Sequence, residues 1–365
     1  MHRERLVAAR RVVVKIGSRL IHERPDETLA EVAAEVAAQR ASRSFVVVSS
    51  GAIALGRGVL GLAERPRELA RLQAVAAVGQ GRLMQAWERA FSAHGIPVGQ
   101  VLLTHDDVAD RARFLSARHA LAALLDLGAV PIVNENDTVA TDEIKFGDND
   151  RLAALTVSLT AADALVILTD VDGLHDAPPA QGGRRVPLVR DVDREAAPVA
   201  GAPSPGIGTG GMASKVQSAK IAGKSGVPTV VARGGPGVVG RVLAGEDVGT
   251  LFLPSDERLQ GRKHWIAYAL KPAGVLVVDA GARAALVDGR KSLLPSGIRE
   301  VRGAFAIGDA VSIRSEDGAE FARGLASYAA EEIVRIRGRR SADIEPILGY
   351  KYLDEVVHRD DLVIL

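Results

Sequence analysis

The feature that most constrains the fold is a series of short apolar segments separated by longer helix-forming segments. The apolar segments are rich in Val and Ile and are mostly uninterrupted by polar residues. A strand with one face in water would instead alternate apolar and polar residues, so continuous segments favour parallel strands covered on both faces. The predicted strands are Val12–Ile16, Phe45–Val48, Pro97–Leu103, Val130–Val133, Ala164–Leu168 and Val227–Val231.

The segments between these strands are rich in Ala, Leu, Arg and Gln, residues that favour helices. Strands that alternate with helices predict an α/β fold, an open and mostly parallel sheet sandwiched by helices. We assign this domain to residues 1–258. The main predicted helices are Leu29–Arg40, Leu69–Ala93, Arg111–Leu127, Arg151–Ala161 and Met212–Ala222.

A second domain is indicated by a change of pattern after the polar stretch SDERLQGRK. We assign residues 259–272 to a linker and residues 273–365 to a small, mostly β domain. Its predicted strands are Val275–Asp279, Ala284–Val287, Ala310–Ile313 and Glu332–Ile336. Within the first domain, residues 177–210 are rich in Pro and Gly around a strand-like segment, Val186–Val189, and we expect a mobile flap there.

Composition excludes several classes of function. The 46 Lys and Arg against 45 Asp and Glu leave a net charge of +1, so no overall field recruits nucleic acid or an anionic membrane. The absence of cysteine excludes disulfides, thiolate metal sites and a Cys nucleophile. The N-terminal apolar run is interrupted by Lys15, and the segment Leu152–Leu168 carries too many polar residues for a membrane span. We therefore expect a cytoplasmic protein.

Polar or small residues directly follow several of the predicted strands. The longest such stretch, VPIVNENDTVATDEIKFGDND at Val130–Asp150, begins as a strand and ends in clustered carboxylates and amides. For any one of these turns a solvated surface loop is the alternative. Because parallel strands end at the same sheet edge, where ligands bind in open α/β sheets, the turns together predict a site. They are Lys15 with Gly17, Ser49–Gly51, Asn134–Asp137, and Thr169 with Asp170.

The segment Gly208–Lys215, GTGGMASK, is a glycine-rich loop that opens a predicted helix and delivers a lysine. Free N–H groups, a helix dipole and a cation suit phosphate oxygens, although a flexible helix cap and loop is the alternative. The segment does not fit the Walker pattern. With the acids and amides of the rim it points to phosphoryl transfer with Mg²⁺.

Two further motifs favour structural roles. The run Thr104–Asp107, with one His among acids, is better explained as a helix cap than as a metal site. The basic run Arg335–Arg340 is typical of a solvated surface, although RNA contact is an alternative.

The motifs VVVKIGS, VVVSSGAIALG, PIVNENDTVATDEIKFGDND, LTDVDGL and GTGGMASK, in this order, resemble the glutamate 5-kinase (γ-glutamyl kinase) group of the amino acid kinase family. The segments LLPSGIREVRG and ILGYKYLDEVVHRDD resemble its C-terminal PUA domain. The resemblance implies transfer of the ATP γ-phosphate to the side-chain carboxylate of L-glutamate, giving L-glutamate 5-phosphate, the first step of proline biosynthesis. A carboxylate nucleophile has a reference pKa of about 4.3 and needs no general base, which agrees with the absence of an obvious catalytic His.

The resemblance also implies roles for individual residues. Lys15 and Lys215 would neutralise charge on the phosphoryl group, and Asp150 would hold both lysines. The positions that match the glutamate site are Ser50, Gly51, Asn134, Asp137, Asp148 and Asn149, with Asp137 as partner of the α-ammonium. The positions that match the ATP site are Lys15, Gly17, Thr169, Asp170, Thr209, Gly210, Gly211, Met212, Ala213, Ser214 and Lys215, with amides expected from Gly17 and Gly51. No protein side chain is expected to ligate the metal, because ATP phosphates and water would hold Mg²⁺.

Further expectations follow from the resemblance alone: L-proline as feedback inhibitor, a homo-oligomer (dimer or tetramer), and functional coupling to glutamate-5-phosphate reductase. The chain departs from many relatives at His175–Pro179, where they carry a Tyr and a DPR-like run, so adenine-side contacts of the flap are not transferred.

Two alternatives stay open. The PUA-like domain could bind RNA, against which stand the near-zero net charge and few aromatics, and the acceptor could be acetylglutamate, aspartate or a nucleotide.

Overall fold

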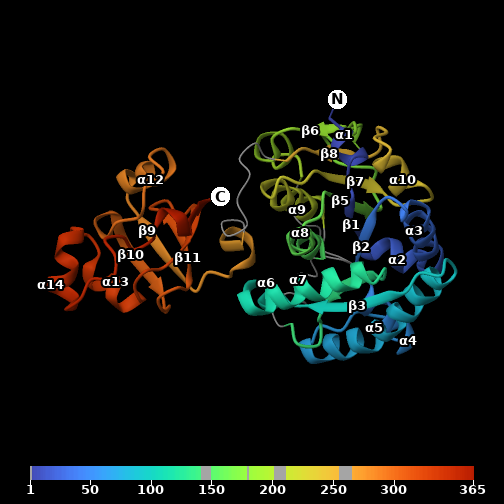
Figure 1. The fold of residues 1–365 in the computed structure, drawn as a ribbon, viewed down its shortest axis with the longest axis horizontal. Helices are drawn as coiled ribbons and strands as arrows, with labels where there is room; N and C mark the ends of the chain where they lie inside the picture. The colour runs from blue at the N-terminus through green and yellow to red at the C-terminus, as the bar shows by residue number, and fades with distance from the viewer. Residues whose placement is uncertain (1, 141–148, 179–180, 201–210, 255–264) are drawn as a thin grey trace. The chain divides into compact units, whose positions relative to one another are not determined.

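The computed structural model describes residues 2–140, 149–178, 181–200, 211–254 and 265–365. The chain divides into two compact units, Met1–Arg258 and Leu259–Leu365, and each is described by itself (Figure 1). In the part of the chain that is described, no helix is long and apolar enough to cross a membrane.

The N-terminal unit is built on an eight-stranded sheet with the order β3-β4-β2-β1-β5-β7-β8-β6. Neighbouring strands from β3 through β7 are parallel, and β8 runs antiparallel to β7. All the strands predicted for this unit are confirmed, and the mostly parallel α/β fold with them. The strands are β1 Arg11–Ile16, β2 Ser44–Ser49, β3 Val98–Leu103, β4 Val130–Glu135, β5 Ala164–Thr169, β6 Leu188–Val189, β7 Thr229–Arg233 and β8 Thr250–Phe252.

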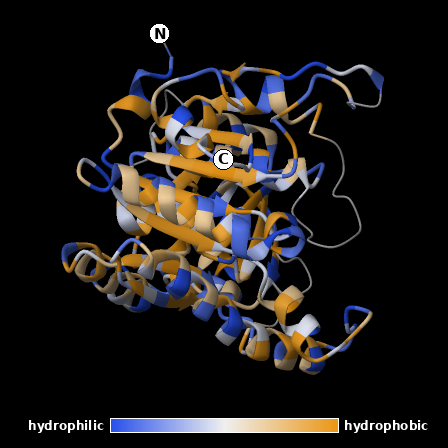
Figure 2. Ribbon diagram, turned by 90° about the vertical axis from the view of Figure 1, so that its right-hand side faces the viewer, coloured by the Kyte–Doolittle hydropathy of each residue, from blue (hydrophilic) through white to orange (hydrophobic). Residues whose placement is uncertain are grey.

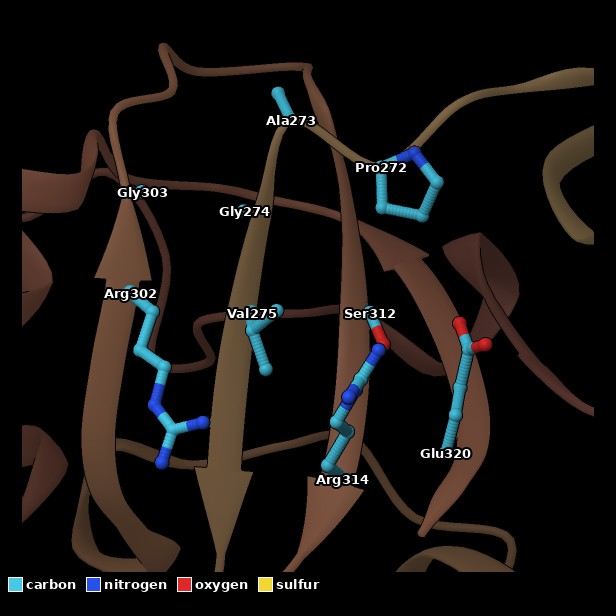
Figure 3. A pocket seen from close by; sticks show the side chains of 9 residues that line it. All are labelled: Pro272, Ala273, Gly274, Val275, Arg302, Gly303, Ser312, Arg314 and Glu320. Carbon is cyan, nitrogen blue, oxygen red and sulfur yellow. The ribbon is translucent and has the colours of Figure 1, made fainter. Parts of the chain in front are cut away.

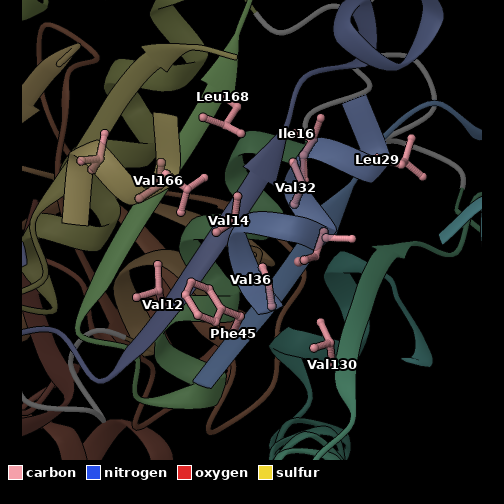
Figure 4. Close-up of a cluster of buried hydrophobic side chains, with 14 of the residues drawn as sticks. Val12, Val14, Ile16, Leu29, Val32, Val36, Phe45, Val130, Val166 and Leu168 are labelled. Atoms are coloured by element: carbon pink, nitrogen blue, oxygen red, sulfur yellow. The ribbon is translucent and has the colours of Figure 1, made fainter. Parts of the chain in front are cut away.

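Helices cover both faces of this sheet. On one face, Val12, Val14 and Ile16 of β1 pack with Val32 and Val36 of α3 in the main core (Figure 4). On the opposite face lies α8, whose side chains are buried along most of its length. The helices are α1 Glu4–Val7, α2 Ser18–Glu23, α3 Pro25–Gln39, α4 Ala52–Val59, α5 Leu69–Ser92, α6 His105–Ala109, α7 Arg111–Asp126, α8 Asn149–Thr160, the π-helix η3 Val192–Ala196, α9 Met212–Lys224 and α10 Val238–Leu243.

The continuous apolar runs are explained by this two-sided cover. Every residue of β5 is buried, as are all residues of β1 after Arg11. Colouring by hydropathy shows the strands as mostly hydrophobic (Figure 2). The predicted cap before α6 is also confirmed, because the Thr104 side chain accepts from the Asp107 N–H, and the Asp107 carboxylate accepts from the Thr104 N–H.

The C-terminal unit contains a five-stranded sheet with the order β10-β9-β11-β12-β13. Its pairs are antiparallel except β9 with β11, which confirms the mostly β prediction. A cavity of about 310 Å³ opens on one face of this sheet, beside Arg302, Ser312, Arg314 and Glu320 (Figure 3). The elements are η4 Trp265–Ala269, β9 Gly274–Val278, α12 Ala280–Val287, η5 Pro295–Gly297, β10 Ile298–Gly303, β11 Ala310–Ser315, β12 Glu320–Leu325, α13 Ala330–Ile336, η6 Ser341–Asp343, α14 Ile344–Leu348, η7 Arg359–Asp361 and β13 Leu362–Ile364.

Two predicted strands of this unit are wrong. Ala284–Val287 forms the end of helix α12, and Glu332–Ile336 lies within helix α13. Local capping explains both cases, since the Asp279 carboxylate accepts from the Ala282 N–H and the Glu332 carboxylate accepts from the Ala329 N–H. Helix N-terminal signals therefore outweigh the β-branched content of these segments.

Candidate active site

The strand ends do meet at one edge of the sheet. Ile16 is paired with Ser49 of β2 on one side and with Leu168 of β5 on the other. Since β4 is parallel to β2, the polar residues that follow β1, β2, β4 and β5 gather at this rim. The placement predicted from the parallel pattern is confirmed for Lys15, Gly17, Ser49–Gly51, Asn134, Thr169 and Asp170.

A buried ion cluster joins three elements at the rim. Strand alternation turns Lys15 away from the face of Val14 and Ile16, towards α8. The Lys15 ammonium lies 2.5 Å from one carboxylate oxygen of Asp150, in the first turn of α8. The Lys215 ammonium, in the first turn of α9, lies 3.0 Å from the other oxygen. One carboxylate therefore holds two lysines that are far apart in the sequence.

The charges in this cluster are almost completely removed from water, with Lys15 and Lys215 each 4% exposed and Asp150 0%. Burial alone would raise the pKa of Asp150, but the Lys15 and Lys215 ammoniums and the Ser214 hydroxyl lower it to about 2. The Ser214 hydroxyl donates to Asp150 at 2.6 Å. Two cations against one anion leave a net positive charge, which suits an anionic phosphoryl group.

A second cluster, formed by uncharged amides, lies next to the ions. The Asn149 side-chain N–H₂ donates to the Ser49 carbonyl at 3.1 Å, to the Ser50 hydroxyl at 2.9 Å and to the Asn134 carbonyl oxygen at 3.0 Å. Gly51 follows with a φ of +106°, and its added Cβ would lie 2.8 Å from Ile21, so a side chain is excluded there. The backbone can therefore approach a ligand closely, and α4 begins directly after Gly51.

Asp137 differs from Asp150 in the balance between burial and neighbouring charge. Burial raises the pKa of Asp137 to about 6, and the positive charge of Arg65 opposes that shift only in part. The Asp137 side chain is only half-buried, and a carboxylate with a raised pKa gains from a cationic ligand, because the ligand would stabilise its charged form. This matches the expected partner of an α-ammonium group.

The predicted nucleotide side lies at the end of β5 and the start of α9. Thr169 donates to the Asp170 carboxylate at 3.0 Å, and Arg19 pairs with that carboxylate at 2.5 Å. Burial would raise the pKa of Asp170, but hydrogen bonds from Arg19 and Thr169 hold it below its usual value. At α9, Gly211 precedes the first turn, which contains Met212, Ala213 and Ser214, and N–H groups at a helix start have no partner within the helix itself.

One expectation on this side needs correction. The Gly17 N–H donates to the Leu168 carbonyl at 2.9 Å and is therefore not available to a phosphate in this arrangement. A Cβ at Gly17 would lie 3.2 Å from that same carbonyl, so the glycine provides close approach between β1 and β5 instead. Three other predicted residues, Asp148, Thr209 and Gly210, lie outside the described residues.

Sequence reasoning missed Gln80, Trp87 and Arg19. Gln80 accepts from the Asn134 N–H₂ at 2.7 Å, and the Trp87 indole donates to the Ser49 hydroxyl at 2.9 Å. Gln80 carried a usable signal, since it is a polar residue at the spacing of the buried face of α5, between Ala76 and Leu83. Arg19 carried none, because its partner comes from a distant strand.

Comparison with known proteins extends these observations. The model of the amino acid kinase family matches residues 10–233, and the PUA domain model matches residues 274–348. A protein from Pelobacter propionicus named Glutamate 5-kinase is 49% identical over 375 residues, covering 100% of both chains. A protein of the same name from Geobacter sulfurreducens is 50% identical, and the match covers 99% of each chain. Another from Myxococcus xanthus is 51% identical, and the match covers 100% of this chain and 98% of the relative.

Proposed function

The chain belongs to the amino acid kinase family, and from that premise we propose that it transfers the γ-phosphate of ATP to the side-chain carboxylate of L-glutamate. The product is L-glutamate 5-phosphate. Full-length relatives at about half identity carry the name Glutamate 5-kinase, which supports this acceptor over acetylglutamate, aspartate or a nucleotide. The single observation that carries the chemistry is the buried Asp150 carboxylate, which holds Lys15 and Lys215 together.

The transfer step needs little covalent chemistry from the protein. The glutamate carboxylate is ionised at neutral pH and attacks the γ-phosphorus, while the bond to the β-phosphate oxygen breaks and ADP leaves. Lys15 and Lys215 neutralise negative charge on the transferring group. Asp150 fixes both ammoniums in advance, so their positions need no reorganisation during the reaction.

The acceptor is held by the amide cluster and Asp137. The Asp137 carboxylate pairs with the α-ammonium of glutamate, and the Ser50 hydroxyl and Asn149 amide contact its polar groups. Gly51 and the start of α4 provide backbone N–H groups beside them. On the nucleotide side, Thr169, Asp170 and the segment from Gly211 to Lys215 contact ATP, with Thr209, Gly210 and Asp148 as further members of the site.

Mg²⁺ would be held by the ATP phosphates and by water rather than by side chains of the protein. The residues present fit a metal held by phosphates and water, because both oxygens of Asp150 already contact ammonium groups. Among the described residues there is no group of three carboxylate or imidazole side chains that could hold the ion. When bound, Mg²⁺ neutralises charge on the nucleotide phosphates.

Further parts of this proposal rest on the family alone. L-Proline inhibits by competing with glutamate, the protein works as a homo-oligomer, and the product passes to glutamate-5-phosphate reductase in the cytoplasm. We divide the chain into a kinase domain at 1–258, a linker at 259–272 and a PUA-like domain at 273–365.

Trapping with hydroxylamine tests the function. Protein, ATP, Mg²⁺ and L-glutamate should yield γ-glutamyl hydroxamate together with ADP in equal amounts. The same assay with acetylglutamate, aspartate or UMP as acceptor, followed by ADP release, serves as the comparison. Turnover of one of these acceptors without turnover of glutamate would overturn the assignment.

A further inference from the structure

The amide cluster extends beyond the residues assigned to the acceptor. Asn149 comes from the α8 layer, Asn134 from the end of β4, and Gln80 from α5 on the other side of the sheet. Hydrogen bonds of 3.0 Å and 2.7 Å connect the three side chains in that order. They form a chain of amides, here called the amide relay, which passes around the sheet edge.

The direction of every bond in the amide relay is fixed from one end. The Ser49 backbone carbonyl can only accept, so the Asn149 group that faces it must be the N–H₂. That N–H₂ also meets Asn134, which must therefore turn its carbonyl oxygen to Asn149 and its own N–H₂ to Gln80. Gln80 must then present its carbonyl oxygen to Asn134.

At each end of the amide relay, one polar atom makes no hydrogen bond to the described residues. Within the part of the chain that is described, neither the Asn149 carbonyl oxygen nor the Gln80 N–H₂ has a hydrogen-bond partner, and both atoms are buried. A buried polar atom without a partner costs free energy, so its retention at a binding site suggests a ligand partner. The free acceptor of Asn149 suits an ammonium group.

Close packing of α5 on α4 places the helix backbone next to Gln80. Its neighbour Gly79 packs directly on α4, and a Cβ there would lie only 1.7 Å from the Ala52 carbonyl. The opposing Gly56 makes an equally close approach, with an added Cβ 1.9 Å from the Val75 carbonyl. Since α4 begins at Ala52, beside Gly51, α5 is fixed relative to the acceptor side of the rim.

We propose that Gln80 is a positioning residue that, through Asn134, helps to hold the Asn149 amide in place with its carbonyl oxygen towards the α-ammonium of the acceptor. Without the Gln80 oxygen, the Asn134 N–H₂ loses its acceptor, and the Asn134 side chain is no longer held at the end of β4. The Asn149 N–H₂ then loses the support of the Asn134 oxygen and is held by Ser49 and Ser50 alone, so its carbonyl oxygen is positioned less precisely. This inference rests on the proposed function and adds a determinant of acceptor choice.

The test compares L-glutamate with glutarate, which has the same two carboxylates but no ammonium group. In Gln80→Leu the ratio of kcat/KM for glutamate over glutarate should fall about tenfold, because a hydrogen bond to a charged group is weakened. KM for ATP should stay unchanged. Gln80→Glu should restore the ratio, since its carboxylate can still accept from Asn134.

Gln85→Leu is the matched control, because Gln85 is exposed on the same helix, where its side-chain oxygen accepts a hydrogen bond from the exposed Arg82. It should leave the ratio and both KM values at wild-type levels. Thermal unfolding of all variants separates loss of packing from loss of orientation. An unchanged ratio in a folded Gln80→Leu protein that still phosphorylates glutamate would overturn the role of Gln80, whereas a wild-type protein inactive with glutamate would overturn the proposed function itself.

Discussion

The two halves of the proposed site, one for the phosphoryl group and one for the acceptor, are held together by different forces. Charge holds the phosphoryl half, where Asp150 pairs with Lys15 and Lys215 inside the protein. Neutral hydrogen bonds hold the acceptor half, where Asn149 and Asn134 connect to Gln80. Charge is strong and acts over distance, so it suits a reaction that spreads negative charge over several oxygens. Amides are directional, so they suit recognition of one small molecule.

Of the substitutions that test this comparison, replacement of Asp150 should cause the largest loss of activity. In Asp150→Asn the two buried ammoniums lose their shared counter-ion, and kcat should fall by at least about a hundredfold, or roughly 3 kcal/mol. The free energy of unfolding should also fall by about 3 kcal/mol, because buried charges are left uncompensated. Initial rates and urea unfolding measure the two losses.

The control for this variant is Asp193→Asn. Asp193 also pairs with a lysine, Lys220 at 2.9 Å, but its side chain is 63% exposed. An exposed ion pair contributes about 1 kcal/mol or less, so kcat should not change. Equal losses in the two variants would show that burial has no special role.

Replacement of Asn149 should mainly change binding. In Asn149→Leu the amide cluster loses its hydrogen bonds to Ser49, Ser50 and Asn134. KM for glutamate should rise about tenfold to a hundredfold, in line with 1–3 kcal/mol for lost buried hydrogen bonds, while KM for ATP stays constant. A selective rise in KM for ATP would contradict the division into two halves.

The acceptor half should also respond to pH. Burial raises the pKa of Asp137 to about 6, so the carboxyl is protonated below that pH in the free protein and loses its attraction for an ammonium. KM for glutamate should therefore rise about tenfold per pH unit below 6, and Asp137→Asn should remove this dependence. The raised pKa also affects the free energy of unfolding. Between pH about 4 and about 6 the Asp137 carboxyl is protonated in the folded protein but ionised in the unfolded chain, so stability falls as pH rises through this range. A salt-bridged carboxylate, whose pKa is lowered, has the opposite effect. A KM independent of pH over this range would argue against Asp137 as the partner of the ammonium.

The smallest effect is expected at Arg19. Its guanidinium pairs with Asp170, but its side chain is 52% exposed, so solvent weakens the interaction. Arg19→Ala should change KM for ATP by about threefold or less and leave KM for glutamate unchanged. Arg24→Ala, which removes another exposed ion-paired arginine from the same region, is the control. A larger change in KM for glutamate than for ATP would show that Arg19 belongs to the acceptor half of the site.

Most strands of the first unit were predictable because they are buried on both faces, β3 at the edge of the sheet being the exception. Burial of this kind leaves a continuous apolar segment in the sequence, as at β1 and β5. In the second unit β10 (IREVRG) and β12 (EFARGL) are only partly buried, and because they mix charged and apolar residues the apolar pattern does not predict them. Two helices there were mistaken for strands because their caps were not recognised.

The site was predictable only in part. Parallel strand order alone brings the polar turns to one rim, but the pairing of Asp150 with both lysines was implied by family resemblance and not by spacing. The spacing of Gln80 indicates the buried face of α5, but it gives no indication of the partner of its side chain. Its partner, Asn134, becomes visible only when α5 is packed against the sheet.

The most direct test of the comparison between the two halves measures kcat and KM for glutamate in Lys215→Ala and Asn134→Leu with the hydroxamate assay. We predict that Lys215→Ala lowers kcat at least about a hundredfold with KM for glutamate within about threefold of wild type. We predict the reverse for Asn134→Leu, a rise of about tenfold or more in KM with kcat within about threefold. Equal changes of kcat and KM in both variants would contradict a charged half for transfer and an amide half for recognition.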